Sequence, residues 1–171
     1  MRNDHFLFLK GGNMKKILLS CITMLLMAGC SPSYPRDTST ARLRQLSMDE
    51  VNEMIENDET FMFVFTQETC SSCLYFKENV LSYYIQDHGF DFNEVVLDME
   101  SDDFQKAADF VAEHPNPEQF LTSDLLPTDV LTPSFYFIEE GEVMEIYIGG
   151  DLSVDEFDQL IQKYQLDKIE E

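Results

Sequence analysis

Hydrophobic residues recur along residues 47–171 with two periods, one typical of helices and the other of buried strands. Apolar residues three and four apart predict helices over 47–57, 71–87 and 102–114, and a final helix from 153 onward. An unbroken apolar run predicts a strand over 61–65, and Val95-Val96-Leu97 predicts a second within 92–99. A turn at 139–142 between 134–138 and 143–148 predicts a hairpin of two further strands. This order predicts an α/β fold, a central mixed sheet of about four strands with helices on both faces.

Local signals mark where several helices begin and end. Ser47 and Ser153 each precede a glutamate by three residues, which is the spacing of a capping box. In the second helix the apolar spacing predicts a core-facing set, namely Leu74, Val80, Leu81, Tyr84 and Ile85. Residues 118–131 follow no clear period, although 119–126 have the length and composition for a short helix.

The N-terminal segment has the layout of a secretory signal peptide. Met14-Lys15-Lys16 is followed by a mostly apolar run over residues 17–29, which is too short to span a bilayer. The run ends in Met27-Ala28-Gly29-Cys30, which resembles a bacterial lipobox, with Met27 where leucine is more usual. That resemblance implies cleavage before Cys30 and lipidation of its thiol; a disulfide at Cys30 is the alternative.

The rest of the N-terminal region divides the chain into three parts. We expect translation to begin at Met14, because Lys10 to Met14 would be encoded by a purine-rich ribosome-binding site and a start codon. Residues 31–45 are rich in Ser, Thr, Pro and Arg, which favours a flexible tether. The predicted parts are residues 1–29 (upstream segment and signal peptide), 30–46 (lipid-anchored tether) and 47–171 (the folded domain).

The composition restricts the classes of partner. A chain of 171 residues with 44% hydrophobic residues is long enough for one domain with a real core. Cleavage before Cys30 would leave 7 basic and 32 acidic residues, a net charge of −25. Such a charge disfavours nucleic acid as a partner and docking on lipids through a basic patch. Solubility is the simplest reason for the acidity.

Cys70 and Cys73 are the cysteines left once Cys21 and Cys30 fall into the signal and anchor. They lie where a buried strand turns into a helix, so that Cys70 would occupy the helix N-terminus, where unpaired N–H groups favour a thiolate. In this arrangement Cys70 would be the nucleophile and Cys73 the resolving thiol. Two alternatives are a permanent disulfide and a zinc site, which would need further ligands that the sequence does not offer at suitable spacing.

From about Ser47 to Lys163 the chain resembles the thioredoxin family. The resemblance consists of a strand, Cys-x-x-Cys and a helix, followed later by Thr132-Pro133 before a strand, and by a terminal hairpin and helix. The resemblance implies a thioredoxin-like fold, a cis-proline at Pro133, and substrate binding by Thr132 and Pro133. Within that family the chain looks like lipoproteins described as bacteriocin transport accessory proteins of Gram-positive bacteria.

Three positions depart from the family pattern. Thioredoxins carry Trp at Thr69, a buried acid at Val64 and a lysine at Val96, so their proton relay does not transfer to this chain. The acidic surroundings, including Glu68, oppose a thiolate at Cys70, and Lys77 partly offsets them. We therefore expect a less oxidising pair than one with histidine between the cysteines.

These observations lead to one main hypothesis and two others. The main one is a thiol–disulfide oxidoreductase, lipid-anchored on the extracytoplasmic face of the cell membrane, that acts on exported proteins or peptides. We expect it to be a monomer with no cofactor beyond the Cys70–Cys73 disulfide and no resident metal. The others are a non-catalytic accessory lipoprotein of a bacteriocin export system and a copper or zinc chaperone.

Overall fold

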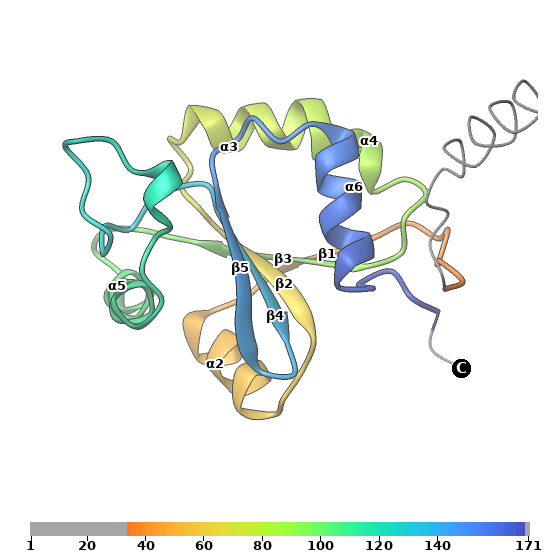
Figure 1. The fold of residues 1–171 in the computed structure, drawn as a ribbon, viewed down its shortest axis with the longest axis horizontal. Helices are drawn as coiled ribbons and strands as arrows, with labels where there is room; N and C mark the ends of the chain where they lie inside the picture. Colours follow the sequence, from red (N-terminus) through yellow and green to blue (C-terminus); the bar gives the residue numbers. More distant parts are fainter. Residues whose placement is uncertain (1–33, 170–171) are drawn as a thin grey trace, which may run out of the picture. The chain divides into compact units, whose positions relative to one another are not determined.

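One mixed sheet runs through the domain, with strand order β1-β3-β2-β4-β5 (Figure 1). The computed structural model describes residues 34–169, so the predicted signal peptide, Cys21 and the predicted lipidation site Cys30 lie outside the described residues. The strands are β1 (Arg42–Gln45), β2 (Phe61–Thr66), β3 (Asp91–Val96), β4 (Ser134–Glu139) and β5 (Glu142–Ile148). β1, β3 and β2 are parallel, while β4 runs antiparallel to β2 and to β5.

The predicted helices are confirmed, with one irregularity in the second. They are α2 (Met48–Glu56), α3 (Ser71–Phe76), α5 (Asp102–Glu113) and α6 (Val154–Lys163). α3 continues through a π-helical turn, η1 (Lys77–Leu81), into α4 (Ser82–Tyr84). Both capping boxes form, at Ser47 and Ser153. The 119–126 stretch holds only a 3-10 turn, η2 (Glu118–Phe120).

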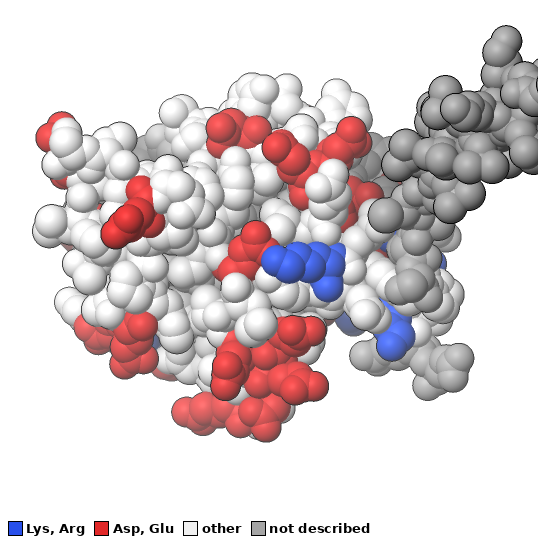
Figure 2. Space-filling model, viewed as in Figure 1, with Lys and Arg blue, Asp and Glu red and all other residues white. Residues whose placement is uncertain are grey.

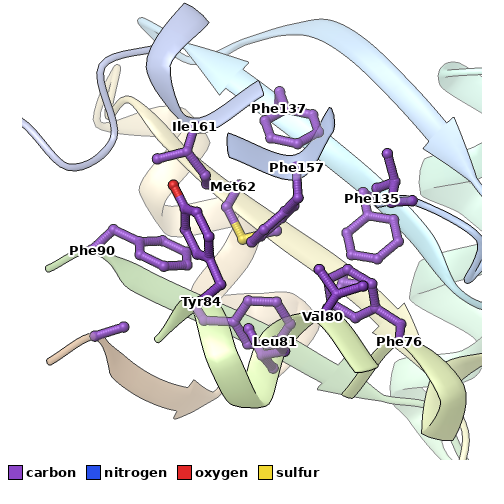
Figure 3. Close-up of a cluster of buried hydrophobic side chains, with 14 of the residues drawn as sticks. Met62, Phe76, Val80, Leu81, Tyr84, Phe90, Phe135, Phe137, Phe157 and Ile161 are labelled. Atoms are coloured by element: carbon purple, nitrogen blue, oxygen red, sulfur yellow. The ribbon is translucent and has the colours of Figure 1, made fainter. Parts of the chain in front are cut away.

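Helices cover both faces of the sheet, as predicted. Alternate residues of β2 point into two separate cores: Met62 and Val64 toward α3, α4 and α6, and Phe63 and Phe65 toward α2 and α5. Aromatic rings dominate the first core, where Phe76 and Tyr84 pack edge-on against Phe157 (Figure 3). Because β2 is buried on both faces, the loop after it is held on a rigid base.

Two sequence predictions are wrong. Residues 34–46, expected to be a tether, belong to the folded domain and supply a fifth strand, β1, on the edge of the sheet. The four side chains of β1 are all exposed, so no hydrophobic period marks the strand. Leu74, expected in the core, is 50% exposed, because Cys73 and Phe76 form the face of α3 that turns toward the sheet. No helix within residues 34–169 is long and apolar enough to cross a membrane.

Candidate redox site

Cys70 and Cys73 are joined by a disulfide at the start of α3, with their Cα atoms 5.3 Å apart. Cys70 is the N-cap of α3, and its sulfur accepts a hydrogen bond from the backbone N–H of Cys73, at 3.1 Å. Cys70 is half-buried, whereas Cys73 is only 2% exposed. The two sulfurs therefore differ in access, and an incoming thiolate reaches Cys70 first.

The Thr132–Pro133 peptide is cis and lies against this disulfide. The carbonyl oxygen of Thr132 is 3.5 Å from the sulfur of Cys70. The sheet brings the two segments together, because Ser134 at the start of β4 pairs with Phe65 near the end of β2. The cis peptide that the family resemblance implies is thus present, and the backbone of Thr132 borders the more accessible sulfur.

Two residues at the site were missed from the sequence. The hydroxyl of Ser72 lies 3.4 Å from the sulfur of Cys70, within hydrogen-bonding range of sulfur. Gly150 packs against the same turn: a Cβ atom there would come within 2.1 Å of the carbonyl oxygen of Ser72. The neighbouring Gly149 donates its N–H to the carbonyl of Pro133, at 3.0 Å. Gly149-Gly150 therefore joins the cis-proline loop to the start of α3.

Lys77 lies one turn beyond Cys73 and forms an ion pair with Glu94 of β3. The same carboxylate accepts a hydrogen bond from the hydroxyl of Thr66, at 2.5 Å. The charge of Lys77 is therefore paired within this cluster. Val64 and Val96, where thioredoxins carry the acid and the lysine, are apolar on this side of the sheet; Val64 is only 1% exposed.

The surface beside the disulfide is acidic. A groove of about 510 Å³ next to Cys70 is lined by Glu68, Asp98, Met99 and Glu100, among others. Glu68 is exposed. Within the described part of the chain, no group of three or more His, Cys, Asp or Glu side chains could hold a metal ion.

The disulfide joins an accessible and a buried sulfur, and it lies at the start of a helix that covers a mixed sheet. These features place the chain in the class of thioredoxin-like proteins with a CxxC disulfide. The family model of the thioredoxin-like domain matches residues 48–165, and the chain belongs to this family. That match begins after β1, so residues 34–46 are an N-terminal addition to the matched region.

Several solved structures are similar in fold. The thioredoxin of Malassezia sympodialis is 12% identical, with a TM-score of 0.48, and the match covers 72% of this chain and 93% of that one. Thioredoxin f2 of Chlamydomonas reinhardtii is 15% identical, with a TM-score of 0.47, covering 74% of this chain and 99% of that one. No curated protein sequence matches the chain.

Proposed function

We propose that this protein is a thiol–disulfide oxidoreductase, anchored on the outer face of the cytoplasmic membrane, that exchanges disulfides with exported proteins or peptides. The observation that carries the proposal is the asymmetry of the pair, with Cys70 half-buried and Cys73 only 2% exposed. A permanent structural disulfide gains little from closing so short a loop, whereas an exchange centre needs one reachable and one protected sulfur.

The exchange proceeds in two balanced steps. A substrate thiolate attacks the sulfur of Cys70; the new bond joins substrate and Cys70, and Cys73 leaves as a thiolate that takes up a proton. A second thiolate of the substrate then attacks the substrate's own sulfur in this mixed disulfide and releases Cys70 as a thiolate. The substrate gains a disulfide and the enzyme becomes a dithiol. Run in reverse, the same steps reduce a substrate disulfide.

Local hydrogen bonds favour the thiolate that Cys70 becomes. The backbone N–H of Cys73 already points at its sulfur, at 3.1 Å, and the hydroxyl of Ser72 lies 3.4 Å away. The helical segment 71–84 adds the positive end of its dipole at the same place. Stabilising its thiolate therefore makes Cys70 a good leaving group in the second step, and a larger thiolate fraction makes it the nucleophile in the reverse direction.

The location is the second part of the proposal. It is supported by the basic start at Met14-Lys15-Lys16, the short apolar run after it, and the small residues before Cys30. Lipid on Cys30 would anchor the domain, and an extracytoplasmic site suits a disulfide, since thiols in the cytoplasm are kept reduced.

Trapping tests the chemistry. Cys73→Ser, in the full chain expressed in a Gram-positive host, removes the resolving thiol, so mixed disulfides between Cys70 and substrates should accumulate. They should appear on non-reducing gels and be absent from the Cys70→Ser/Cys73→Ser double variant. If the single variant traps nothing and Cys70→Ser retains full biological function, the exchange reaction is ruled out and an accessory role for the lipoprotein remains. Incorporation of labelled palmitate into the wild type but not into Cys30→Ser tests the anchor separately.

A further inference from the structure

The first described residues are fastened to the domain by a partly buried cluster of charges. The guanidinium of Arg36 donates to Asp158 and to Asp167, each at 2.5 Å, and to the hydroxyl of Tyr84, at 2.9 Å. The hydroxyl of Tyr34 also donates to Asp167, whose side chain has no exposed surface. Because loss of Arg36 would leave a buried carboxylate unpaired, the chain enters the folded domain at a fixed point.

This entry point lies at the amino end of the parallel strands. The carbonyl of Asp37 accepts a hydrogen bond from Gly89, and Arg42 at the start of β1 donates to Phe90, both at 2.9 Å and both just before β3. Cys70 instead follows Thr66, which pairs with Val96 at the carboxyl end of β3. A strand of the length of β2 covers about 20 Å, so entry point and disulfide lie at opposite ends of the sheet (Figure 1).

Little chain separates the entry point from the proposed lipid site. Residues 31–33 lie between Cys30 and Tyr34, and four steps of backbone reach at most about 14 Å. The tether predicted from the sequence was 15 residues long, so the folded segment 34–45 removes most of its reach. A lipid on Cys30 would therefore keep the amino end of the sheet close to the bilayer.

Basic side chains lie at the amino end of the sheet, together with acidic ones. Arg42, Arg44 and Lys168 line a groove of about 480 Å³ at the amino end, where the acids Asp37, Glu59 and Asp91 balance them. The lining of the groove beside Cys70 carries acids and no Lys or Arg. In the view of Figure 2, acidic side chains spread widely, while the few basic ones lie on the side of α6 and the C-terminus. Glu139 and Glu140 also lie at the amino end, beside the start of β2, so charge does not distinguish the two ends, and the orientation follows from the short connection to Cys30.

We propose that a lipid on Cys30 holds the amino end of the sheet, around Leu43, Arg42 and Lys168, toward the membrane, with the Cys70–Cys73 pair facing the aqueous phase. The inference rests on the lipidation of Cys30 in the proposed function. It narrows the substrates to exported, water-soluble chains that approach from outside, because a cysteine at the bilayer surface would meet the wrong end of the domain.

Single tryptophans test this orientation, since the chain has no Trp. Leu43→Trp and Met99→Trp place one at each end, at side chains that are 59% and 74% exposed. The full lipidated chain would be reconstituted into phosphatidylcholine–phosphatidylglycerol vesicles that carry a nitroxide on the lipid headgroup. We expect the nitroxide to quench the tryptophan at position 43 at least twofold more than that at position 99. Ile169→Trp, 47% exposed at the same end as Leu43, serves as a second reporter if Leu43→Trp does not fold.

The outcomes separate this inference from the proposal beneath it. Suppose that the chains float with the vesicles but are quenched equally at the two positions, or more strongly at position 99. That result overturns the orientation and leaves the anchor intact. Chains that carry no lipid and do not float overturn the anchor, and the orientation with it. Neither result bears on the disulfide exchange, which the trapping experiment measures.

Discussion

The carbonyl oxygen of Thr132 lies 3.5 Å from the sulfur of Cys70, although the two residues are 62 positions apart in the chain. An extended segment of a substrate that pairs with the backbone around Thr132 would thus bring its cysteine alongside Cys70. In the dithiol state the Cys70 thiol can donate to the same carbonyl. The cis-proline loop therefore borders the site, and its backbone carbonyl at Thr132 contacts the sulfur of Cys70.

The hydroxyl of Ser72 should make Cys70 more reactive. Ser72→Ala removes one of the hydrogen bonds that stabilise the Cys70 thiolate, and we expect the reduced protein to react with iodoacetamide at pH 7 about three- to tenfold more slowly. Stopped-time alkylation followed by mass spectrometry measures the rate. Ser71→Ala is the matched control, since Ser71 is exposed and makes no side-chain hydrogen bond to Cys70; an equal loss of reactivity in both variants would refute the role of Ser72.

Gly150 should tolerate no side chain. Gly150→Ala would place a methyl group 2.1 Å from the carbonyl oxygen of Ser72, so the loop or the start of α3 must shift. We expect the free energy of unfolding to fall by about 1–3 kcal/mol, as in overpacked cores, and the reduction potential to change with the displaced Ser72. Urea unfolding and equilibration with glutathione measure the two quantities. A variant with unchanged stability and potential would show that this contact is not tight.

Much of the fold is predictable because each buried element leaves a local pattern. Phe61 to Phe65 form an unbroken apolar run, and Ser47 and Ser153 cap helices through contacts within three residues. β1 escaped detection because Arg42 to Gln45 bury no side chain and are held by backbone pairing to β3. Hydrogen bonds between backbones carry no sequence signature, which is why the domain begins earlier than its hydrophobic pattern suggests.

Some residues of the site can likewise be predicted from the sequence, and others cannot. Cys70, Cys73 and Pro133 are visible from the sequence because their residue types are chemically distinctive. Ser72 and Gly150 became evident only from tertiary structure, since a serine and a glycine are common in loops. The partner of Lys77 was also hidden: Glu94 is remote in sequence, and only the packing of η1 over β3 brings the two together.

The Arg36 cluster should contribute strongly to stability. Arg36→Ala leaves the fully buried Asp167 without its guanidinium partner, so we expect a loss of about 3–5 kcal/mol in the free energy of unfolding. Arg42→Ala is the matched control, because Arg42 is 79% exposed and its pair with Asp91 should contribute about 1 kcal/mol or less. Denaturant unfolding of the full chain in detergent compares them. Similar losses of unfolding free energy in the two variants would contradict the stabilising role of the Arg36 cluster.

The same cluster should make stability depend on pH. Burial opposes ionisation of Asp158, but hydrogen bonds from Arg36 and Tyr84 outweigh it, so the pKa of Asp158 lies below its ordinary 3.8. A carboxyl group with a lowered pKa in the folded state stabilises the protein above its unfolded-state pKa, and this contribution is lost as the pH falls through the lower, folded-state pKa. Asp158→Asn removes the contribution, while Asp167 still pairs with Arg36.

We therefore expect Asp158→Asn to unfold at a lower temperature than the wild type at pH 7, and the difference in Tm to shrink as the pH is lowered below about 4. Thermal unfolding by circular dichroism between pH 7 and pH 3 measures the difference directly. The comparison cancels the other carboxylates that titrate in this range. Asp124→Asn, at an exposed side chain, is the matched control and should differ little from the wild type in Tm at pH 7. A wild-type advantage over Asp158→Asn that persists undiminished to pH 3 would mean that Asp158 does not titrate as part of the Arg36 cluster.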